Sequence, residues 1–211
     1  MEFHKFINAI EGPNYKMMPN QHSLLTFIHK TKNCIIYKER QEGVSTAISL
    51  YLLWTLITIP NITIGLISHS TQEREIFRQT VNMSLSKLEE LFKQILGTDR
   101  DLLFTPATHN TNETSFPNGS KIKYWNSTNK NAGRGEALDM VYISELGYNN
   151  DWEEIIWSIT PCLAAKKDSR LIISSTVLRN LKEGFFKDSD IQEHWCGDLF
   201  DGKRTVLFEK C

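Results

Sequence analysis

The sequence lacks the features that mark membrane-spanning, secreted and zinc-binding proteins. No apolar run reaches the roughly 20 residues that a membrane helix needs, and the first residues show neither the basic region nor the apolar core of a signal peptide. The 4 cysteines form no CxxC pair and have no histidine at metal-ligand spacing. We therefore expect a soluble protein with reduced cytosolic thiols and without a membrane partner.

A strong charge of one sign is also missing. The formal net charge is −1, with 23% charged and 40% hydrophobic residues. The surface as a whole is not a polycation, so any contact with nucleic acid must be local or made by an oligomer. A chain of 211 residues is long enough for one well-buried domain with a small appendage.

Four apolar segments predict strands that are buried on both faces, as in a parallel sheet, because none of them alternates with polar residues. They are residues 33–37, 62–68, 140–144 and 170–174. A capping-box pattern at residues 70–73 opens a long amphipathic helix that ends before Gly97, and to this helix we assign packing but no chemistry. The alternation of strands and helices predicts a three-layer α/β fold.

Two further segments between these elements have distinct patterns. Asn118-Gly119 predicts a hairpin turn, beside the main sheet, in which both residues have positive φ. The polar segment 126–135 contains glycines and no periodicity, which predicts an exposed loop before the third strand.

A phosphate-binding loop is predicted where the first strand turns into a helix, at residues 37–46. The backbone amides of such a turn and the positive end of the helix suit a phosphate. The loop departs from the GxxxxGK[ST] pattern, because Gly43 is followed by Val44 in the place of the lysine and Lys38 stands at the first glycine position.

Another group must then neutralise the phosphates. Arg40 is the best candidate in the loop, because a guanidinium bridges two phosphate oxygens and stays charged. Ser45 aligns with the hydroxyl that holds Mg²⁺ in such loops, and Thr46 is the alternative.

A carboxylate follows the third strand. In NTPases of this design the strand lies next to the strand before the loop, and its terminal glutamate polarises the attacking water, a role that falls here to Glu145. The position before it usually holds an aspartate that binds Mg²⁺ through water. Here it is Ser144, which can bind a metal-bound water but supplies no charge.

The fourth strand runs into the small hydroxyl residues Ser174, Ser175 and Thr176. In motor ATPases such a turn senses the γ-phosphate, since its hydroxyls change partners when the phosphate leaves. We therefore predict a coupling element at the end of this strand.

Together these motifs resemble the ATPase domain of the large terminase subunit, the DNA-packaging motor of tailed bacteriophages. The matching segments are the loop at residues 40–46, Ala132 to Gly135 ahead of residues 141–145, and residues 173–176. The resemblance covers roughly residues 15 to 180 and implies the three-layer P-loop NTPase fold of the RecA/ASCE type.

The resemblance also implies roles for single residues. Arg40 would contact the β- and γ-phosphates, Glu145 would be the catalytic carboxylate, and Gln21 would recognise the adenine edge. Arg134 would reach into the site of the neighbouring subunit, as a trans arginine finger. The implied ATP-binding residues are Gln21, Arg40, Gln41, Glu42, Gly43, Val44, Ser45 and Thr46.

As a member of this family the chain would bind ATP and Mg²⁺ and act on double-stranded DNA. It would work as a homo-oligomeric ring docked on a viral portal, together with a small terminase subunit. We expect a single ATPase domain with its core at about residues 20–176 and a lid or edge subdomain at 177–211. The 35 residues after Thr176 leave no room for the nuclease domain of family members.

The residues alone leave other functions open. Val44 and Ser144 replace charged residues, which favours a nucleotide-binding or regulatory module that has lost hydrolysis. A small-molecule kinase on the same loop would keep the loop lysine and add an arginine-bearing lid, neither of which is evident. A two-domain helicase has no room for its second motor domain.

Overall fold

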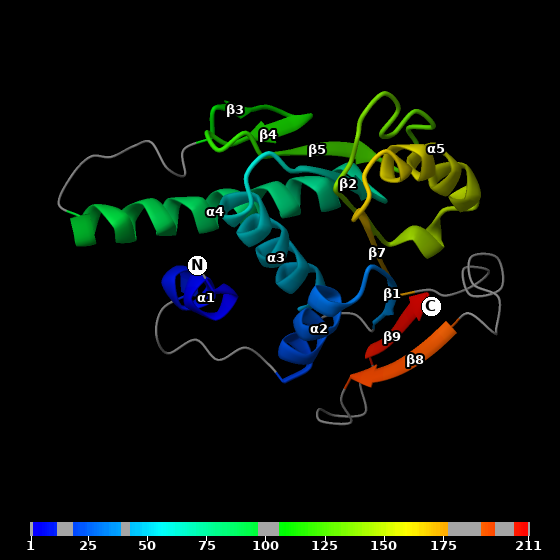
Figure 1. Ribbon diagram of the computed structural model, residues 1–211, viewed down its shortest axis with the longest axis horizontal. Helices are drawn as coiled ribbons and strands as arrows, with labels where there is room; N and C mark the ends of the chain where they lie inside the picture. Colours follow the sequence, from blue (N-terminus) through cyan, green and yellow to red (C-terminus); the bar gives the residue numbers. More distant parts are fainter. Residues whose placement is uncertain are drawn as a thin grey trace.

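One mixed sheet forms the centre of the molecule in the computed structural model, which describes residues 2–11, 19–38, 43–96, 106–176, 191–196 and 205–210 (Figure 1). Within these residues the strand order is β3-β4-β5-β2-β6-β7-β1-β9-β8. The strands are β1 Asn33–Tyr37, β2 Thr63–Ser68, β3 Thr108–His109, β4 Glu113–Ser115, β5 Lys121–Asn126, β6 Met140–Ser144, β7 Arg170–Ser175, β8 Ile191–Cys196 and β9 Thr205–Lys210.

The five central strands, β5, β2, β6, β7 and β1, run parallel, and antiparallel strands extend the sheet at both edges. All four predicted strands are confirmed, and the mainly parallel sheet with them. The expectation that β6 lies next to β1 is wrong, because β7 pairs with both and separates them. A side chain that follows β6 can therefore contact one that follows β1 only by reaching over the end of β7.

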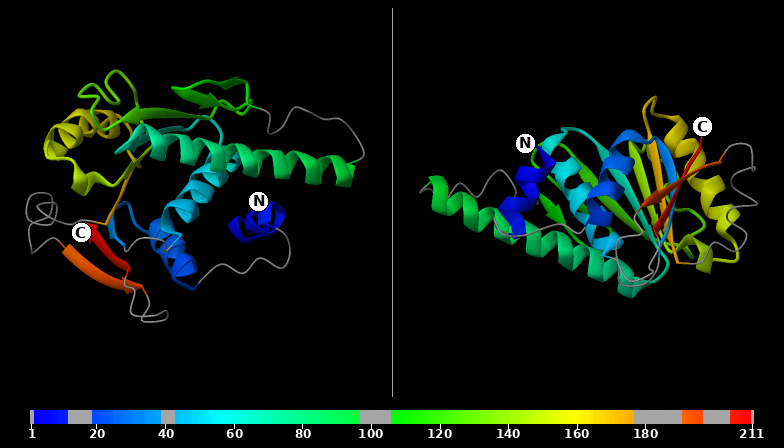
Figure 2. Two further views of the ribbon diagram at one scale, coloured as in Figure 1. Left: turned by 180° about the vertical axis from the view of Figure 1, so that it is seen from behind. Right: turned by 90° about the horizontal axis from the view of Figure 1, so that it is seen from below.

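Helices cover both faces of the sheet and make the fold three-layered, as predicted. One face carries four helices and the other carries α5, which Figure 2 shows on the opposite side of the strands. The helices are α1 Phe3–Glu11, α2 Pro19–Lys30, α3 Val44–Thr58, α4 Thr71–Leu96 and α5 Trp152–Ala164, and the short 3₁₀ helix η1 spans Leu146–Tyr148.

Strand β6 shows why its sequence is apolar without alternation. Met140 and Tyr142 pack into the core under α1 to α4, whereas Val141 and Ile143 pack into the core under α5. Each face of the strand thus has its own hydrophobic cluster, so every position is buried.

The long helix and the hairpin follow the sequence, with one correction. Helix α4 is confirmed, and β4 and β5 form the antiparallel hairpin within the sheet. Only Gly119 has a positive φ, of 82°, and Asn118 does not. The Gly119 N–H donates to Phe116 O, and this bond with one left-handed glycine is typical of a three-residue hairpin loop rather than the predicted two-residue turn.

The segment before β6 is less exposed than the sequence predicts. Ala132 and Gly133 are buried, and Cys162 Sγ on α5 donates to Gly133 O at 2.9 Å. The neighbouring residues Lys130, Asn131 and Arg134 are exposed. The loop is therefore anchored at its middle while polar side chains around the anchor face solvent.

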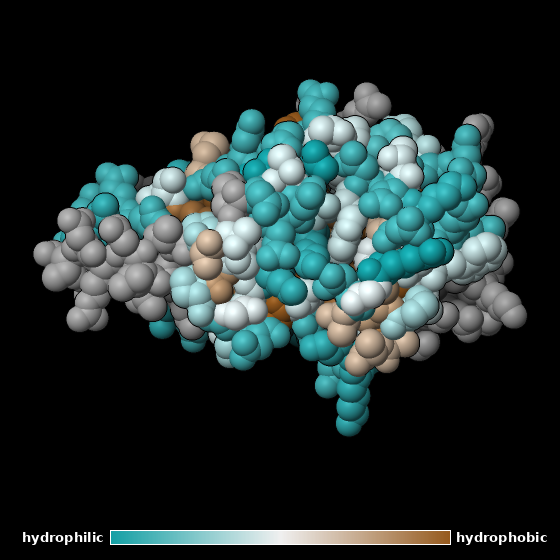
Figure 3. All heavy atoms as spheres, turned by 90° about the horizontal axis from the view of Figure 1, so that it is seen from above, coloured by the Kyte–Doolittle hydropathy of each residue, from teal (hydrophilic) through white to brown (hydrophobic). Residues whose placement is uncertain are grey.

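The remaining expectations concern the surface and the thiols. Among the described helices, none combines the length and the apolar content that crossing a membrane requires. The face in Figure 3 is mainly hydrophilic, with small scattered hydrophobic groups. Cys34 and Cys162 are buried free thiols.

Candidate nucleotide site

Several of the predicted functional residues meet at the carboxyl ends of the parallel strands. Because β1, β2, β6 and β7 are parallel, their carboxyl ends lie together, and the register pairs Tyr37 with Ser175 and Ser144 with both Ser174 and Ser68. The residues that follow these strands are Lys38, Glu145 and Thr176. This edge is where ligands bind in open α/β sheets.

A buried ion pair joins the loop strand to the predicted catalytic glutamate. Lys38 Nζ lies 2.8 Å from Glu145 Oε1, and only 9% and 11% of the two side chains are exposed. The other oxygen, Oε2, accepts hydrogen bonds from the Thr176 backbone N–H at 2.8 Å and from Thr176 Oγ1 at 3.0 Å. Both oxygens are thus held in place, and Oε1, which among the described residues accepts only from Lys38, keeps a lone pair for a water.

In the sequence, Lys38 is only a departure from the loop pattern and has no predicted role. Its contact with Glu145 passes over the end of β7, where the residues are small. Ser174 and Ser175 are fully buried there, and neither projects far enough to separate the lysine from the carboxylate. The feature of the sequence that could have indicated a role is a lysine placed directly after a buried strand.

The backbone at Glu145 is strained. Its φ of 55° and ψ of 40° lie in the left-handed region, which non-glycine residues rarely adopt. The Glu145 N–H donates to Ser174 O at 2.7 Å, and η1 begins at the next residue. Such conformations cost about 1–3 kcal/mol and cluster at functional sites. Here the strain turns the chain sharply and aims the carboxylate toward Lys38.

The start of α3 offers backbone amides to an anion. Gly43 precedes it with a φ of 68°, and no side chain in the described part of the chain caps the helix. The amides of Val44, Ser45 and Thr46 therefore have no partner within the helix. Arg40, Gln41 and Glu42 lie outside the described residues, so their predicted phosphate contacts stay predictions.

Gln21, the predicted adenine-binding residue, lies beside this helix start. It is 5% exposed, and its Nε2 donates to Gly43 O at 3.2 Å. The structure thus brings α2 to the phosphate loop, although the role of the amide in binding adenine is untested.

Hydroxyl groups gather between α3 and the sheet. Tyr142 Oη and Ser174 Oγ are 2.8 Å apart. Burial raises the pKa of Tyr142, and hydrogen bonds with Ser174, Ser144 and Ser45 oppose that rise. The two predicted metal-binding serines, Ser45 and Ser144, therefore lie around the same phenol. They also line a cavity of ≈ 160 Å³.

Glu73, from the first turn of α4, lines this cavity as well. Burial raises the pKa of Glu73, and so does the negative charge of Glu145, while a hydrogen bond from the His69 N–H lowers it. In the sequence, Glu73 is explained as a helix cap and has no predicted chemistry. The clue to a role in the site is that the helix follows β2, the strand that pairs with β6.

The described residues do not contain three histidine, cysteine or acidic side chains that could hold a metal together. The donors around the cavity are hydroxyl and carboxylate oxygens, which suit Mg²⁺. Mg²⁺ usually takes only one or two protein ligands, with waters and substrate phosphates completing its coordination. The donor set therefore fits a nucleotide-bound Mg²⁺ rather than an all-protein site.

Arg134 lies away from this site. It lines a separate polar cavity of ≈ 420 Å³ with Arg74, Asn126 and Glu136, among others. None of these residues lines the cavity of Ser45 and Ser144. The position agrees with an arginine that acts on a neighbour, but that role stays a prediction.

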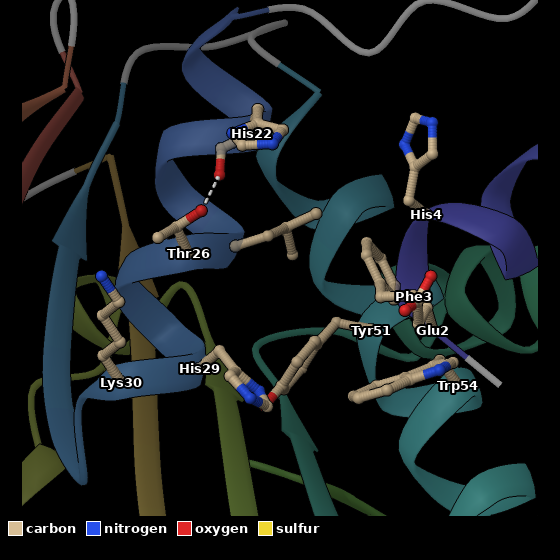
Figure 4. A pocket seen from close by; sticks show the side chains of 10 residues that line it. Glu2, Phe3, His4, His22, Thr26, His29, Lys30, Tyr51 and Trp54 are labelled. Atoms are coloured by element: carbon tan, nitrogen blue, oxygen red, sulfur yellow. Dashed lines mark hydrogen bonds between the residues drawn. The ribbon is translucent and has the colours of Figure 1, made fainter.

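A third cavity, of ≈ 400 Å³, lies between α1, α2 and α3 (Figure 4). Its walls include Phe3, Tyr51 and Trp54, and His29 Nδ1 is 3.4 Å from Tyr51 Oη. None of the predicted nucleotide residues lines it. Besides aromatic surface it has Lys30 and three histidines, but it lies apart from the strand ends that carry Glu145 and Thr176, so it is the weaker candidate for ATP.

Replacing Lys38 with methionine is expected to lower the free energy of unfolding by about 3 kcal/mol, because it leaves the Glu145 carboxylate buried without its counter-charge. Chemical denaturation measures the loss. The double variant Lys38→Met with Glu145→Gln removes both charges and is expected to lose less than the sum of the two single variants.

The matched control is Lys87→Met. Lys87 pairs with Glu11 at 3.3 Å, but 42% of the lysine side chain is exposed, so the expected loss is under about 1 kcal/mol. Equal losses for the Lys38 and Lys87 variants would contradict a buried, stabilising contact between Lys38 and Glu145.

Known proteins resemble this chain in structure rather than in sequence. No protein-family model and no curated protein matches the sequence. The HK97 bacteriophage large terminase aligns with 83% of this chain at 18% identity and a TM-score of 0.63, and the alignment spans 38% of that protein. The ATPase domain of the Thermus phage P74-26 large terminase aligns with 82% at 22% identity and a TM-score of 0.54, over 68% of its length. The chain therefore has the fold of phage large-terminase ATPase domains.

Proposed function

We propose that this chain is the ATP-hydrolysing domain of a viral DNA-packaging motor. The observation that carries the proposal is the arrangement around Glu145, a strained residue at the carboxyl edge of the sheet whose two carboxylate oxygens are fixed by Lys38 and Thr176. The start of α3, which no side chain among the described residues caps, completes a site with an anion-binding end and a fixed base.

In this site the amides at the start of α3 and the Arg40 guanidinium bind the phosphates, and Gln21 contacts the adenine. Glu145 accepts the proton of the attacking water. Thr176 keeps the carboxylate in position, and its hydroxyl also bonds to Tyr148 Oη, which links the base to η1. Ser45, and Ser144 through water, would hold Mg²⁺, which would supply positive charge to the phosphates.

The wider role follows from the fold of the large terminases. We propose a homo-oligomeric ring on a portal, acting on double-stranded DNA with a small terminase subunit in the host cytoplasm. The net charge of −1 supports contacts with DNA that are local or shared between subunits. Residues 205–210 form β9 antiparallel to β1, and β8 lies beyond it at the edge, in keeping with an appendage that completes the ATPase core.

ATP hydrolysis measured against protein concentration and added double-stranded DNA tests this function. We expect turnover per subunit to rise with concentration and with DNA, because Arg134 must come from a neighbouring subunit. Turnover that is independent of both would contradict the ring, and no turnover at any concentration would contradict the motor.

A nucleotide-binding module without hydrolysis is the second candidate. The pairing of Lys38 with Glu145 favours it, since the ammonium compensates the charge of the carboxylate that would act as the base. Parallel measurements of ATP affinity and ATP turnover separate the two functions, because this candidate predicts binding with no turnover.

A further inference from the structure

The first turn of α4 places a second carboxylate beside the end of β6. Ser144 Oγ donates to Glu73 Oε1 at 3.4 Å, a long hydrogen bond. Strand β2 pairs with β6 in register, Ser68 opposite Ser144, so the helix that follows β2 begins over Ser144. The position that lacks an aspartate in the sequence therefore has a glutamate at hydrogen-bonding distance.

Glu73 is held rather than free to rotate. Its Oε2 accepts from the His69 N–H at 3.2 Å, and its own N–H donates to Ser70 Oγ at 3.2 Å. These two bonds, to His69 and to Ser70, hold Glu73 at the helix start in the manner of a capping box. Oε1 is left on the side of Ser144, toward the cavity.

The described charged groups at and near this cavity carry a net negative charge. Glu73 lines the cavity, and the charge of Glu145, which pairs with Lys38, is close enough to raise the pKa of Glu73. Helix α3 contributes the hydroxyls of Ser45 and Thr46 to the lining. A divalent cation in this cavity would meet oxygen donors of the type that Mg²⁺ prefers.

We propose that Glu73 supplies the carboxylate that Ser144 lacks and positions the Mg²⁺ that enters with ATP, through Ser144 or a metal-bound water. The inference rests on the proposed nucleotide site and adds a residue from α4 to it. Glu73 is a positioning residue, because it acts on the metal and not on the reacting phosphate.

The variant Glu73→Gln tests this role apart from helix capping, since glutamine also closes a capping box but carries no charge. We expect the affinity for Mn²⁺, in the presence of a non-hydrolysable ATP analogue, to fall about tenfold, as for other residues that support metal ligands. Electron paramagnetic resonance of free Mn²⁺ gives this affinity without any turnover. Binding of the analogue without metal should not weaken.

Two further variants make the test specific. Glu75→Gln removes the same charge two residues along α4, where the side chain pairs with Arg78, and should leave Mn²⁺ affinity unchanged. Adding Ser144→Asp to Glu73→Gln returns a carboxylate to the site from β6 and should recover most of the lost affinity.

The outcomes separate this inference from the proposed function. Equal Mn²⁺ affinities for Glu73→Gln and Glu75→Gln, with the analogue still bound, would overturn the role of Glu73 alone. Failure of the unmodified chain to bind the analogue would overturn both. Loss of Mn²⁺ affinity with recovery by Ser144→Asp is the result that supports the proposal.

Discussion

Replacing Glu145 with glutamine is expected to lower ATP turnover by about a thousandfold, because a positioned general base contributes roughly 10²–10⁴-fold. Glutamine keeps the shape but offers one acceptor, so it satisfies either Lys38 or Thr176 and turns its NH₂ toward the other donor. ATP affinity should be retained, since the proposed phosphate contacts come from the start of α3 and from Arg40 and not from Glu145. Steady-state turnover and analogue binding are the two measurements.

Stability must be measured beside activity in this variant. Removing the carboxylate charge leaves the Lys38 ammonium buried, so Glu145→Gln should unfold more easily, and turnover should be measured well below its unfolding temperature. Glu11→Gln is the control, because Glu11 also pairs with a lysine but is partly exposed and far along the chain from the site. Near-normal turnover in Glu145→Gln would remove Glu145 from the mechanism.

The four central strands, the hairpin and helix α4 could be predicted because each follows from a local pattern. A strand such as β6 needs an apolar residue at every position when a hydrophobic cluster lies on each face. Helix α4 is defined by its cap at Ser70 and its apolar spacing. Short-range physics decides such features, so the sequence shows them directly.

The contacts of the site could not be predicted in the same way. Lys38 meets Glu145 because β7 separates their strands and ends in small residues, and strand order does not appear in periodicity. Glu73 has a complete local explanation as a helix cap, which hides its second contact with Ser144. Both residues belong to the site through pairings that are distant in the sequence.

Arg134 combines an exposed side chain with a fixed backbone, which is what an arginine that reaches a neighbouring subunit requires. Gly133 and Gly135, on either side, have φ values of 78° and 82°, and the Arg134 N–H donates to Asn131 O at 3.1 Å. Ala132 is fully buried, and Cys162 donates to Gly133 O, so the loop is tied to α5. The guanidinium is therefore presented on a rigid turn at the surface.

Arg134→Ala is expected to lower turnover of the assembled protein by at least about a thousandfold, because arginine fingers contribute roughly 10³–10⁵-fold. Lys130→Ala is the control, since it removes another exposed positive charge from the same loop and should have little effect. In mixtures with unmodified protein, each Arg134→Ala subunit should disable the site of its neighbour and also slow the coordinated turnover of the ring. Turnover should then fall more steeply than the fraction of variant subunits, whereas a strictly proportional fall would restrict Arg134 to a role within its own subunit.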